Sequence, residues 1–244
     1  MNYQKALKQR HAETGRWLLE SSQYSGWKEE GRTSIWLHGI PGCGKTILSS
    51  TVIEDLLRFR DNDPGKVVAY FFFDFNDAQK QNPELMLRSI ICQLSNRCVK
   101  IPESLDSLYY SCNKGGQQPS QGSLEETMKQ MIQEFPQVYI VLDALDECSD
   151  RTELTDILET IAGWHLDNLH FLVTSRRERD IESSLETFIN QQNMINLETT
   201  LMNEDIQKYI QHRLRNDKKL QKWQKDPGVK QEIEHTLTKG AHGM

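Results

Sequence analysis

Short apolar runs alternate with longer segments of mixed polarity along most of the chain. The apolar runs lie at residues 33–39, 66–75, 137–145, 169–176 and 195–198. The longer runs are apolar throughout rather than at every second position, which is typical of parallel strands buried on both faces. Residues 66–75, KVVAYFFFDF, therefore predict a central strand of a parallel sheet, with the aromatic side chains in the core.

The segments between these runs carry helical periodicity or helix-start signals. Residues 45–59 repeat apolar positions at helical spacing and predict a helix with one buried face. Three further helix starts combine a polar N-cap with a proline at the first helical position or a glutamate three residues on: Asn82 with Pro83, Ser123 with Glu126, and Asp150 with Glu153. The last of these helices is predicted to end at Trp164, and residues 112–122 predict a surface loop.

Strands that alternate with helices predict an α/β fold with a doubly wound parallel sheet. After about residue 200 the strands stop, and residues 203–217 and 229–240 predict two amphipathic helices. We therefore expect an N-terminal helical segment over 1–30, an α/β domain over 31–199 and a small helical subdomain over 200–244. Because the chain stops shortly after a helix C-cap signal at Gly240, we expect this subdomain to be truncated and the chain to be part of a longer protein.

Composition narrows the class of protein. The net charge is −6 and the pI is near 5.7, whereas general nucleic-acid binders usually carry a basic face, so no nucleic-acid partner is expected. No apolar run approaches the roughly 20 residues that cross a bilayer, and the amino terminus lacks the apolar stretch of a secretory signal. The five cysteines form no CxxC pair. We therefore expect no membrane partner, no disulfide framework or zinc site, and a reducing, cytoplasmic location.

A glycine-rich loop joins the first apolar run to the first helix. Residues 39–46 read GIPGCGKT and match GxxxxGK[ST], in which backbone N–H groups and the helix N-terminus hold phosphates. Lys45 is expected to reach the β- and γ-phosphates, and Thr46 to ligate Mg²⁺. Cys43 is either an oxidation target or a small residue that fits the loop. The residues predicted to contact nucleotide here are Gly39, Pro41, Gly42, Cys43, Gly44, Lys45, Thr46 and Ile47.

Acidic residues follow the apolar run at 137–145. Asp143 comes at the carboxyl end of this predicted strand, the edge at which ligands gather in open α/β sheets. It is therefore expected to hold Mg²⁺ through water, opposite Thr46. Glu147, or alternatively Asp146, is expected to orient the water that attacks the γ-phosphate. These acids could instead cap the next helix, although Asp150 suits that role better than Asp143.

The apolar run at 169–176 ends in Thr-Ser-Arg. It predicts Thr174 or Ser175, together with Arg176, beside the same edge. Arg176 is expected to sense the γ-phosphate or to stabilise charge during its transfer, the alternative being a surface arginine after a strand. The chain lacks the NKxD and DxxG motifs of small GTPases. The acids on a separate strand, about 100 residues beyond Lys45, indicate the additional-strand class of P-loop ATPases, in which another strand lies between the lysine loop and the Mg²⁺ acid.

These motifs, taken in order, resemble those of one family. The stretches are WLHGIPGCGKTILSS, VVAYFFFDFND, LRSIICQL, VLDALDEC and FLVTSRRERDI. They are similar to the NACHT domain of fungal receptor-type signalling NTPases (the STAND or NOD-like class), and within it to the nephrocystin-type subgroup. The resemblance extends from about residue 10 to the end of the chain.

The resemblance implies a molecular switch that binds ATP or ADP with Mg²⁺, self-associates through the NACHT domain and hydrolyses nucleotide slowly. It implies an effector domain before this module and repeats after it in the longer protein. Among site residues, it supports Lys45, Thr46 and Asp143, makes Glu147 or Asp146 the hydrolytic acid and makes Arg176 a sensor. It also brings Thr14 and Arg16 near the nucleobase.

Two other functions stay open from the sequence. One is a scaffold whose glycine loop holds a nucleotide without turnover, against which the acids at 143, 146 and 147 argue. The other is a small-molecule kinase, for which no arginine-rich lid is present. The sequence also leaves GTP as an alternative to ATP, because the segments that would contact the base have no clear pattern.

Overall fold

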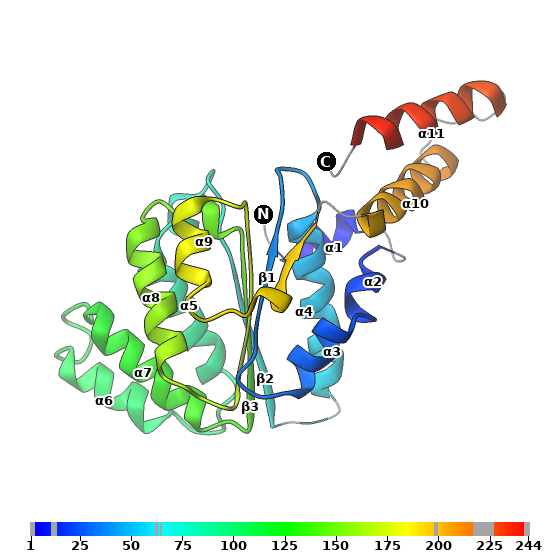
Figure 1. The fold of residues 1–244 in the computed structure, drawn as a ribbon. Helices are drawn as coiled ribbons and strands as arrows, with labels where there is room; N and C mark the ends of the chain where they lie inside the picture. The colour runs from blue at the N-terminus through cyan, green and yellow to red at the C-terminus, as the bar shows by residue number, and fades with distance from the viewer. Residues whose placement is uncertain are drawn as a thin grey trace.

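The computed structural model describes residues 3–10, 14–61, 63, 65–197, 200–216 and 227–241. Within them, five strands form one parallel sheet in the order β2-β3-β4-β1-β5, with helices on both faces (Figure 1). The strands are β1 (Ser34–His38), β2 (Lys66–Phe72), β3 (Gln137–Asp143), β4 (Leu169–Ser175) and β5 (Met194–Asn196). The predicted doubly wound α/β fold is therefore confirmed. So is the additional strand, because β4 lies between β1 and β3.

One face of the sheet packs against the helices near the amino terminus. These are α1 (Tyr3–Gln9), α2 (Arg16–Leu19), α3 (Ser22–Glu29) and the long α4 (Lys45–Asp61). On β3, Tyr139 and Val141 point into the core between this face of the sheet and α3 and α4. Because side chains alternate along a strand, Asp143 points to the same side, toward α4.

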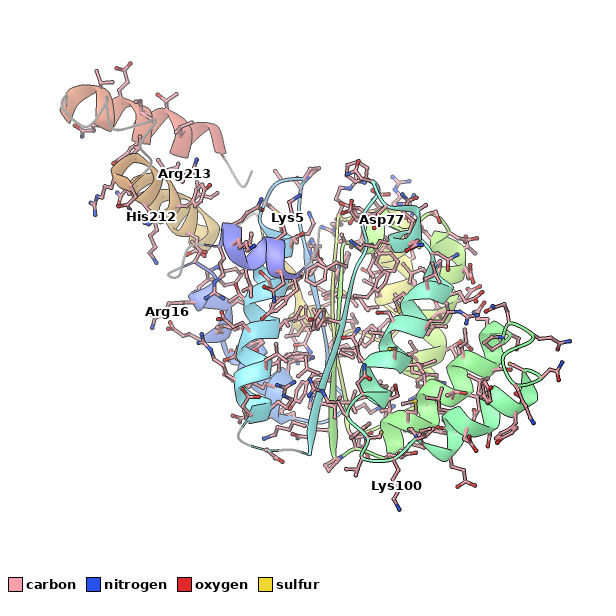
Figure 2. All side chains as sticks on the ribbon, turned by 180° about the vertical axis from the view of Figure 1, so that it is seen from behind. Lys5, Arg16, Asp77, Lys100, His212 and Arg213 are labelled. Carbon is pink, nitrogen blue, oxygen red and sulfur yellow. The ribbon has the colours of Figure 1, made fainter. Side chains whose placement is uncertain are left out.

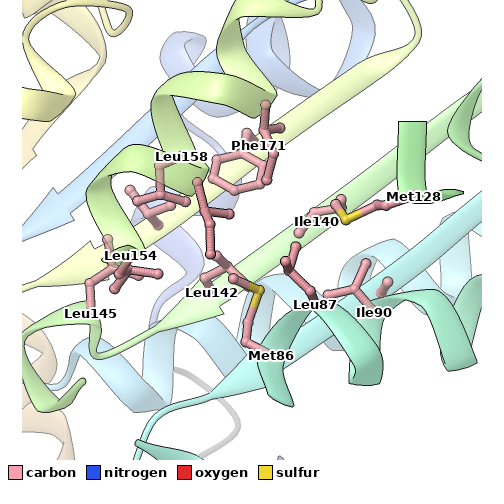
Figure 3. Close-up of a cluster of buried hydrophobic side chains, with 14 of the residues drawn as sticks. Met86, Leu87, Ile90, Met128, Ile140, Leu142, Leu145, Leu154, Leu158 and Phe171 are labelled. Carbon is pink, nitrogen blue, oxygen red and sulfur yellow. The ribbon is translucent and has the colours of Figure 1, made fainter. Parts of the chain in front are cut away.

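The other face packs against α5 (Pro83–Ser95), α7 (Gln121–Gln133), α8 (Arg151–Gly163) and α9 (Arg179–Leu185), with α6 (Glu103–Ser111) outside α7. Figure 3 shows the centre of this core, in which α5, α7 and α8 meet β3 and β4. Its labelled residues are Met86, Leu87, Ile90, Met128, Ile140, Leu142, Leu145, Leu154, Leu158 and Phe171. These buried side chains, on the far face from α4, position β3 and β4.

Two predicted N-caps are confirmed and one is wrong. The Asn82 side chain accepts from the Leu85 N–H at the start of α5, and the Asp150 side chain accepts from the Glu153 N–H at the start of α8. At α7, however, Ser120 rather than Ser123 is the cap, so the helix starts three residues earlier than predicted. The helices α6 and α9 were not predicted, because both are short and follow no strong capping signal.

The prediction of a central strand at residues 66–75 is wrong. The strand is β2, and in the described sheet it lies at the edge, paired with β3 alone. It is nevertheless apolar because α4 and α5 cover its two faces. On its open side, the Gln93 side chain accepts from the Tyr70 N–H at 3.1 Å and donates to the Tyr70 carbonyl at 2.8 Å. One side chain thus takes the place of a neighbouring strand at this position.

Two helices follow the sheet, α10 (Thr200–Asn216) and α11 (Pro227–Ala241). They contact each other and extend away from the sheet beyond α1 and α2 (Figure 1). The predicted helices at 203–217 and 229–240 fall on them, but residue 217, residue 198 at the predicted end of the last strand, and residues 242–244 lie outside the described residues. The predicted domain boundary at 199 stays a prediction. No described helix combines the length and apolar character needed to cross a membrane.

A buried histidine fastens α3 to the sheet. His170 on β4 is fully buried, and its Nδ1 lies 2.7 Å from the Trp27 carbonyl oxygen. Its ring stacks on Tyr139 with centroids 4.4 Å apart. The Trp27 indole in turn donates to the Phe171 carbonyl at 3.1 Å. Burial lowers the pKa of His170, so the imidazole is neutral in the folded protein.

We expect the free energy of unfolding to fall as the pH drops below the ordinary histidine pKa of 6.5. The unfolded chain binds a proton there that the folded chain does not, so His170 contributes a slope approaching about 1.4 kcal/mol per pH unit. His170→Phe keeps the stacked ring, and Thr33 Oγ1 still donates to the Trp27 carbonyl. Urea unfolding should show that the free energy of unfolding falls less between pH 7 and pH 5 in this variant than in the wild type. Equal slopes for the two proteins would contradict the assignment.

Candidate functional site

The predicted site residues lie at the carboxyl edge of the sheet. The ends of β1 and β4 are in register, with His38 opposite Ser175, and β3 ends beside β4, with Leu142 opposite Val173. The glycine loop after β1, the acids after β3 and the arginine after β4 therefore emerge side by side. This is the edge at which parallel α/β sheets bind ligands.

The glycine loop has the backbone of a phosphate cradle. Gly42 and Gly44 adopt left-handed φ angles of 84° and 90°, which favour glycine, and α4 begins directly afterwards at Lys45. The Lys45 ammonium folds back onto the loop and donates to the Gly39 and Ile40 carbonyls at 2.7 and 2.9 Å. A phosphate bound by Lys45 would replace these two carbonyl acceptors.

Cys43 packs inside the loop. Its side chain is 1% exposed and belongs to the core on the α4 side of the sheet. A Cβ atom on Gly39 would lie 2.8 Å from the Cys43 sulfur, closer than such atoms approach. A larger residue at position 39 would therefore force the Cys43 side chain to shift. Burial favours the packing interpretation of Cys43 over the oxidation target.

Asp143 is held by two hydroxyl groups below the loop. It is 1% exposed, and its Oδ1 accepts from Ser49 Oγ on α4 at 2.6 Å and from Thr174 Oγ1 on β4 at 2.8 Å. Burial raises the pKa of Asp143, while hydrogen bonds from Ser49, Thr174 and Thr46 and the charge of Lys45 lower it. A carboxylate that faces hydroxyls and an ammonium in this way suits a hydrated divalent cation.

Thr174 and Ser175, predicted together, point to opposite faces of the sheet. Thr174 faces Asp143, whereas the Ser175 hydroxyl accepts from the Trp36 indole at 2.8 Å on the other face. Ser49 was missed by sequence reasoning. Ser49 lies three residues after Thr46 and therefore on the same face of α4, and this spacing could have indicated it. The apolar positions of the helix drew attention away from this polar pair.

The chain turns sharply after Asp143. Ala144 adopts a left-handed conformation (φ 60°), and its N–H donates to Thr174 Oγ1 at 3.0 Å. This bond stabilises a turn that a residue with a Cβ rarely adopts. The turn carries Leu145–Glu147, a single 3₁₀ turn, over the edge of the sheet.

Asp146 and Glu147 have different partners. Both Asp146 oxygens accept from Arg176: Oδ1 from the backbone N–H at 2.8 Å and Oδ2 from Nε at 2.6 Å. The Asp146 side chain is 4% exposed, and that of Arg176 is 44% exposed. Glu147 instead accepts from the Phe75 N–H at 3.0 Å. Burial raises the pKa of Glu147, and the charges of Asp146, Asp74 and Asp143 raise it further, while the bond from Phe75 lowers it.

Two cavities adjoin the loop. One, of about 650 Å³, is lined by predicted residues from all three strand ends: Pro41, Gly42, Gly44, Lys45, Thr46, Ile47, Asp146, Glu147 and Arg176. The second, of about 910 Å³, lies between the loop and α10, and Thr14, Gly15, Cys43 and Tyr209 are among its lining residues. The Asp205 carboxylate on α10 closes part of it by accepting from the Gly15 N–H at 2.6 Å.

Arg16 lies apart from this arrangement. It lines neither cavity, and its exposed side chain pairs with Glu20 at 3.4 Å (Figure 2). The cavity near α10 thus includes only Thr14 of the two residues expected near the base. Gly39 also lines neither cavity, and its carbonyl accepts from Lys45.

The described residues contain no group of three or more His, Cys, Asp or Glu side chains that could hold a metal ion. Mg²⁺ in nucleotide sites commonly uses one or two protein oxygens together with phosphate oxygens and water. Thr46 and Asp143 can supply such oxygens, and the N-terminus of α4 with Lys45 can supply the positive potential that phosphates need. The residues present therefore fit a nucleotide with its Mg²⁺.

Fold and site together define a P-loop NTPase of the additional-strand class, with a NACHT-type nucleotide-binding module. The chain belongs to the nephrocystin 3 N-terminal family, whose model matches residues 13–176. It is 26% identical over 209 residues to the vegetative incompatibility protein HET-E-1 of Podospora anserina. That match takes in 81% of this chain but only 15% of the fungal protein.

Solved structures show the same fold. The ORC1 protein of Aeropyrum pernix, solved in complex with DNA, superimposes with a TM-score of 0.57 at 16% identity, over 84% of this chain and 49% of that one. A Walker-type ATPase of Pyrococcus abyssi has a TM-score of 0.50 at 12% identity, over 85% and 60%. At such low identity, these likenesses concern the fold alone.

We expect Ser49→Ala to lower the free energy of unfolding by about 1–3 kcal/mol, because it removes a donor from a buried carboxylate. The adjacent Ser50→Ala is a matched control. Ser50 is also fully buried, but among the described residues its hydroxyl donates to the Ile47 carbonyl within α4 and not to Asp143. Urea unfolding should separate the two variants. A loss in Ser50→Ala as large as that in Ser49→Ala would contradict the role given to the Asp143 contact.

Proposed function

We propose that this chain is the nucleotide-binding module of a signalling receptor, which binds ATP or ADP with Mg²⁺ and hydrolyses ATP slowly. GTP is the alternative nucleotide. The observation that carries the proposal is the single 650 Å³ cavity onto which the loop after β1, the acids after β3 and the arginine after β4 converge. A structural turn would need none of these charged groups at its edge.

Each charged group has its own part in this proposal. The loop backbone and Lys45 bind the phosphates, and Thr46 and Asp143 hold Mg²⁺, with Ser49 and Thr174 orienting the Asp143 carboxylate. When bound, Mg²⁺ would neutralise charge on the β- and γ-phosphates. The raised pKa of Asp143 supports this pairing, because a buried carboxylate gains most from a cation beside it.

The contacts of the two acids favour Glu147 over Asp146 as the group that orients water. Both oxygens of Asp146 are already bonded to Arg176, whereas Glu147 has one backbone donor and faces the cavity. Burial also raises the pKa of Glu147, and a carboxylate with a raised pKa is a stronger general base. We assign Asp146 instead to hold Arg176 in place.

The same contacts support the proposal of slow turnover. Lys45 bonds to the Gly39 and Ile40 carbonyls, and Arg176 bonds to Asp146 while lying 3.5 Å from Glu178. When a nucleotide binds, Lys45 and Arg176 have to leave these protein acceptors and bond to phosphate oxygens instead. The binding energy available for catalysis is reduced by the strength of these existing contacts.

The signalling role rests on the family and on its relative in Podospora anserina, which is a vegetative incompatibility protein. We propose that this chain acts within a longer protein in the cytoplasm, self-associates through this module, and is joined to an effector before it and repeats after it. We further propose residues 31–199 as the nucleotide-binding domain, preceded by the helical segment 1–30 and followed by the helical subdomain 200–244. The hydrogen bond from the Gly15 N–H to Asp205 would couple that subdomain to the second cavity, between the glycine loop and α10.

Lys45→Ala should weaken binding of ATP and ADP by roughly 100-fold, because a charge-assisted bond to phosphate is lost. Lys100 carries the same charge at an exposed position, at the opposite end of the molecule from Lys5 and Asp77 (Figure 2). The control variant Lys100→Ala should bind nucleotide like the wild type. Isothermal titration with ATP, ADP and GTP measures both variants and the base preference. If Lys45→Ala binds as tightly as the wild type, the phosphate site is elsewhere.

Glu147→Gln should keep nucleotide affinity within about threefold but slow phosphate release by about 10²- to 10⁴-fold. Asp146→Asn should change turnover less and instead alter the ratio of ATP to ADP affinity, since it loosens Arg176. Single-turnover hydrolysis and titration distinguish the two effects. A larger loss of turnover in Asp146→Asn would move the base to that residue. Absence of turnover in the wild type, with retained ADP, would favour the scaffold function instead.

A further inference from the structure

A second charged cavity lies at the other end of α4. It has a volume of about 360 Å³ and is lined by Arg60 and Asp61 from the last turn of α4, Lys66 and Val67 from the start of β2, and Arg97 after α5. Arg60 is 15 residues beyond Lys45, which places it about 22 Å from the glycine loop along the helix axis. The cavity is therefore separate from the nucleotide site.

Its lining is basic although the chain is acidic. Three cations and one carboxylate give the lining a formal charge of +2, against −6 for the whole chain. Arg60 and Lys66 flank the short turn between α4 and β2, whereas Arg97 follows α5, about 30 residues further along the chain. Their convergence therefore results from the fold and not from a local run of basic residues.

Arg60 has one half of its guanidinium without an acceptor. Its Nη2 donates to Asp61 Oδ1 at 2.8 Å, but its Nη1 is buried and has no hydrogen-bond partner among the described residues. Buried donors nearly always have an acceptor. The C-terminal end of α4 favours basic residues there through the helix dipole, but that effect gives no acceptor to Nη1.

The other two cations differ in how far they are already paired. The exposed Arg97 guanidinium makes no ion pair or hydrogen bond with any described residue. Lys66 Nζ lies 3.2 Å from Asp63 Oδ2 and 3.7 Å from the centre of the Phe59 ring, so it is held in place at the cavity wall. Arg97 thus supplies N–H donors beside a fixed ammonium, and Arg60 lines the same cavity with a guanidinium that lacks one acceptor among the described residues.

We propose that this cavity binds a phosphate-bearing ligand, with Arg60 and Arg97 donating to phosphoryl oxygens and Lys66 adding charge. The planar guanidinium matches a tetrahedral oxyanion with two parallel N–H donors. The volume exceeds that of one phosphate group, so a pyrophosphate or a phosphorylated headgroup fits the cavity. A carboxylate on the ligand would satisfy fewer of these donors.

The test uses Lys45→Ala as the background, so that the glycine loop does not compete for the probe. Inorganic pyrophosphate is titrated calorimetrically into this variant and into double variants that add Arg97→Gln or Arg60→Gln. We expect saturable binding in the background and at least about tenfold weaker binding in each double variant. Arg97 is exposed, so Arg97→Gln remains informative even where Arg60→Gln folds poorly.

Arg58→Gln is the matched control. Arg58 lies half a turn from Arg60, pairs with Glu54 at 2.8 Å and does not line the cavity. It should leave pyrophosphate binding unchanged. Absence of saturable binding in the background, unchanged binding in Arg97→Gln, or an equal loss in Arg58→Gln would each overturn the site. Failure of the nucleotide proposal would show in ATP binding by Lys45→Ala and not in these comparisons.

Two sources can supply the phosphate, and competition separates them. Vesicles of phosphatidylcholine with phosphatidic acid are added to the protein with bound pyrophosphate, and vesicles of phosphatidylcholine alone serve as the reference. Displacement by the acidic vesicles alone supports a lipid headgroup. Retention of pyrophosphate supports a soluble phosphate compound. Displacement that persists in the Arg97→Gln variant contradicts lipid binding at this cavity.

Discussion

The Asp143 carboxylate is held inside the protein by hydroxyl groups from α4 and β4, and the rest of the site depends on this contact. A buried carboxylate without donors would be too costly to ionise. Ser49 supplies one donor only if α4 packs on this face of the sheet, and Thr174 supplies the other only if β4 lies next to β3. The strand order and the helix position are therefore both needed to bring the two donors to this buried carboxyl group. Thr174 also accepts from Ala144, so the same hydroxyl shapes the turn that carries the next two acids.

The two cations at this edge of the sheet, Lys45 and Arg176, already bond to acceptors of the protein itself. Lys45 holds two carbonyl groups of the loop, and Arg176 holds both oxygens of Asp146. A bound phosphate would therefore compete with these protein acceptors for the N–H donors of Lys45 and Arg176. A ligand shifts such an equilibrium only by the difference between its contacts in the two arrangements. A phosphate that binds to Lys45 or Arg176 therefore has to replace acceptors that the protein already supplies.

Sequence patterns predicted those parts of the fold that rest on local chemistry. Asn82 and Asp150 cap their helices as expected, because an N-cap depends on residues within one turn. Patterns failed where distant contacts decide. Residues 66–75 looked central because they are apolar, yet β2 is at the edge, where α4, α5 and the Gln93 side chain replace a further strand. At α7, both Ser120 and Ser123 are of a residue type that caps helices. The spacing from Ser123 to Glu126 predicted Ser123, whereas Ser120 is the cap.

The sequence by itself determined the α/β class, the phosphate loop and the identity of the acids and arginine at the sheet edge. Those features follow from apolar runs, glycine spacing and the residues that end each strand, all of which are local. Only the tertiary structure decided how the charges pair: Asp146 with Arg176, and Asp143 with Ser49 and Thr174. It also brought Arg60, Lys66 and Arg97 together. Pairing depends on distances between elements far apart in the chain, and no local pattern encodes them.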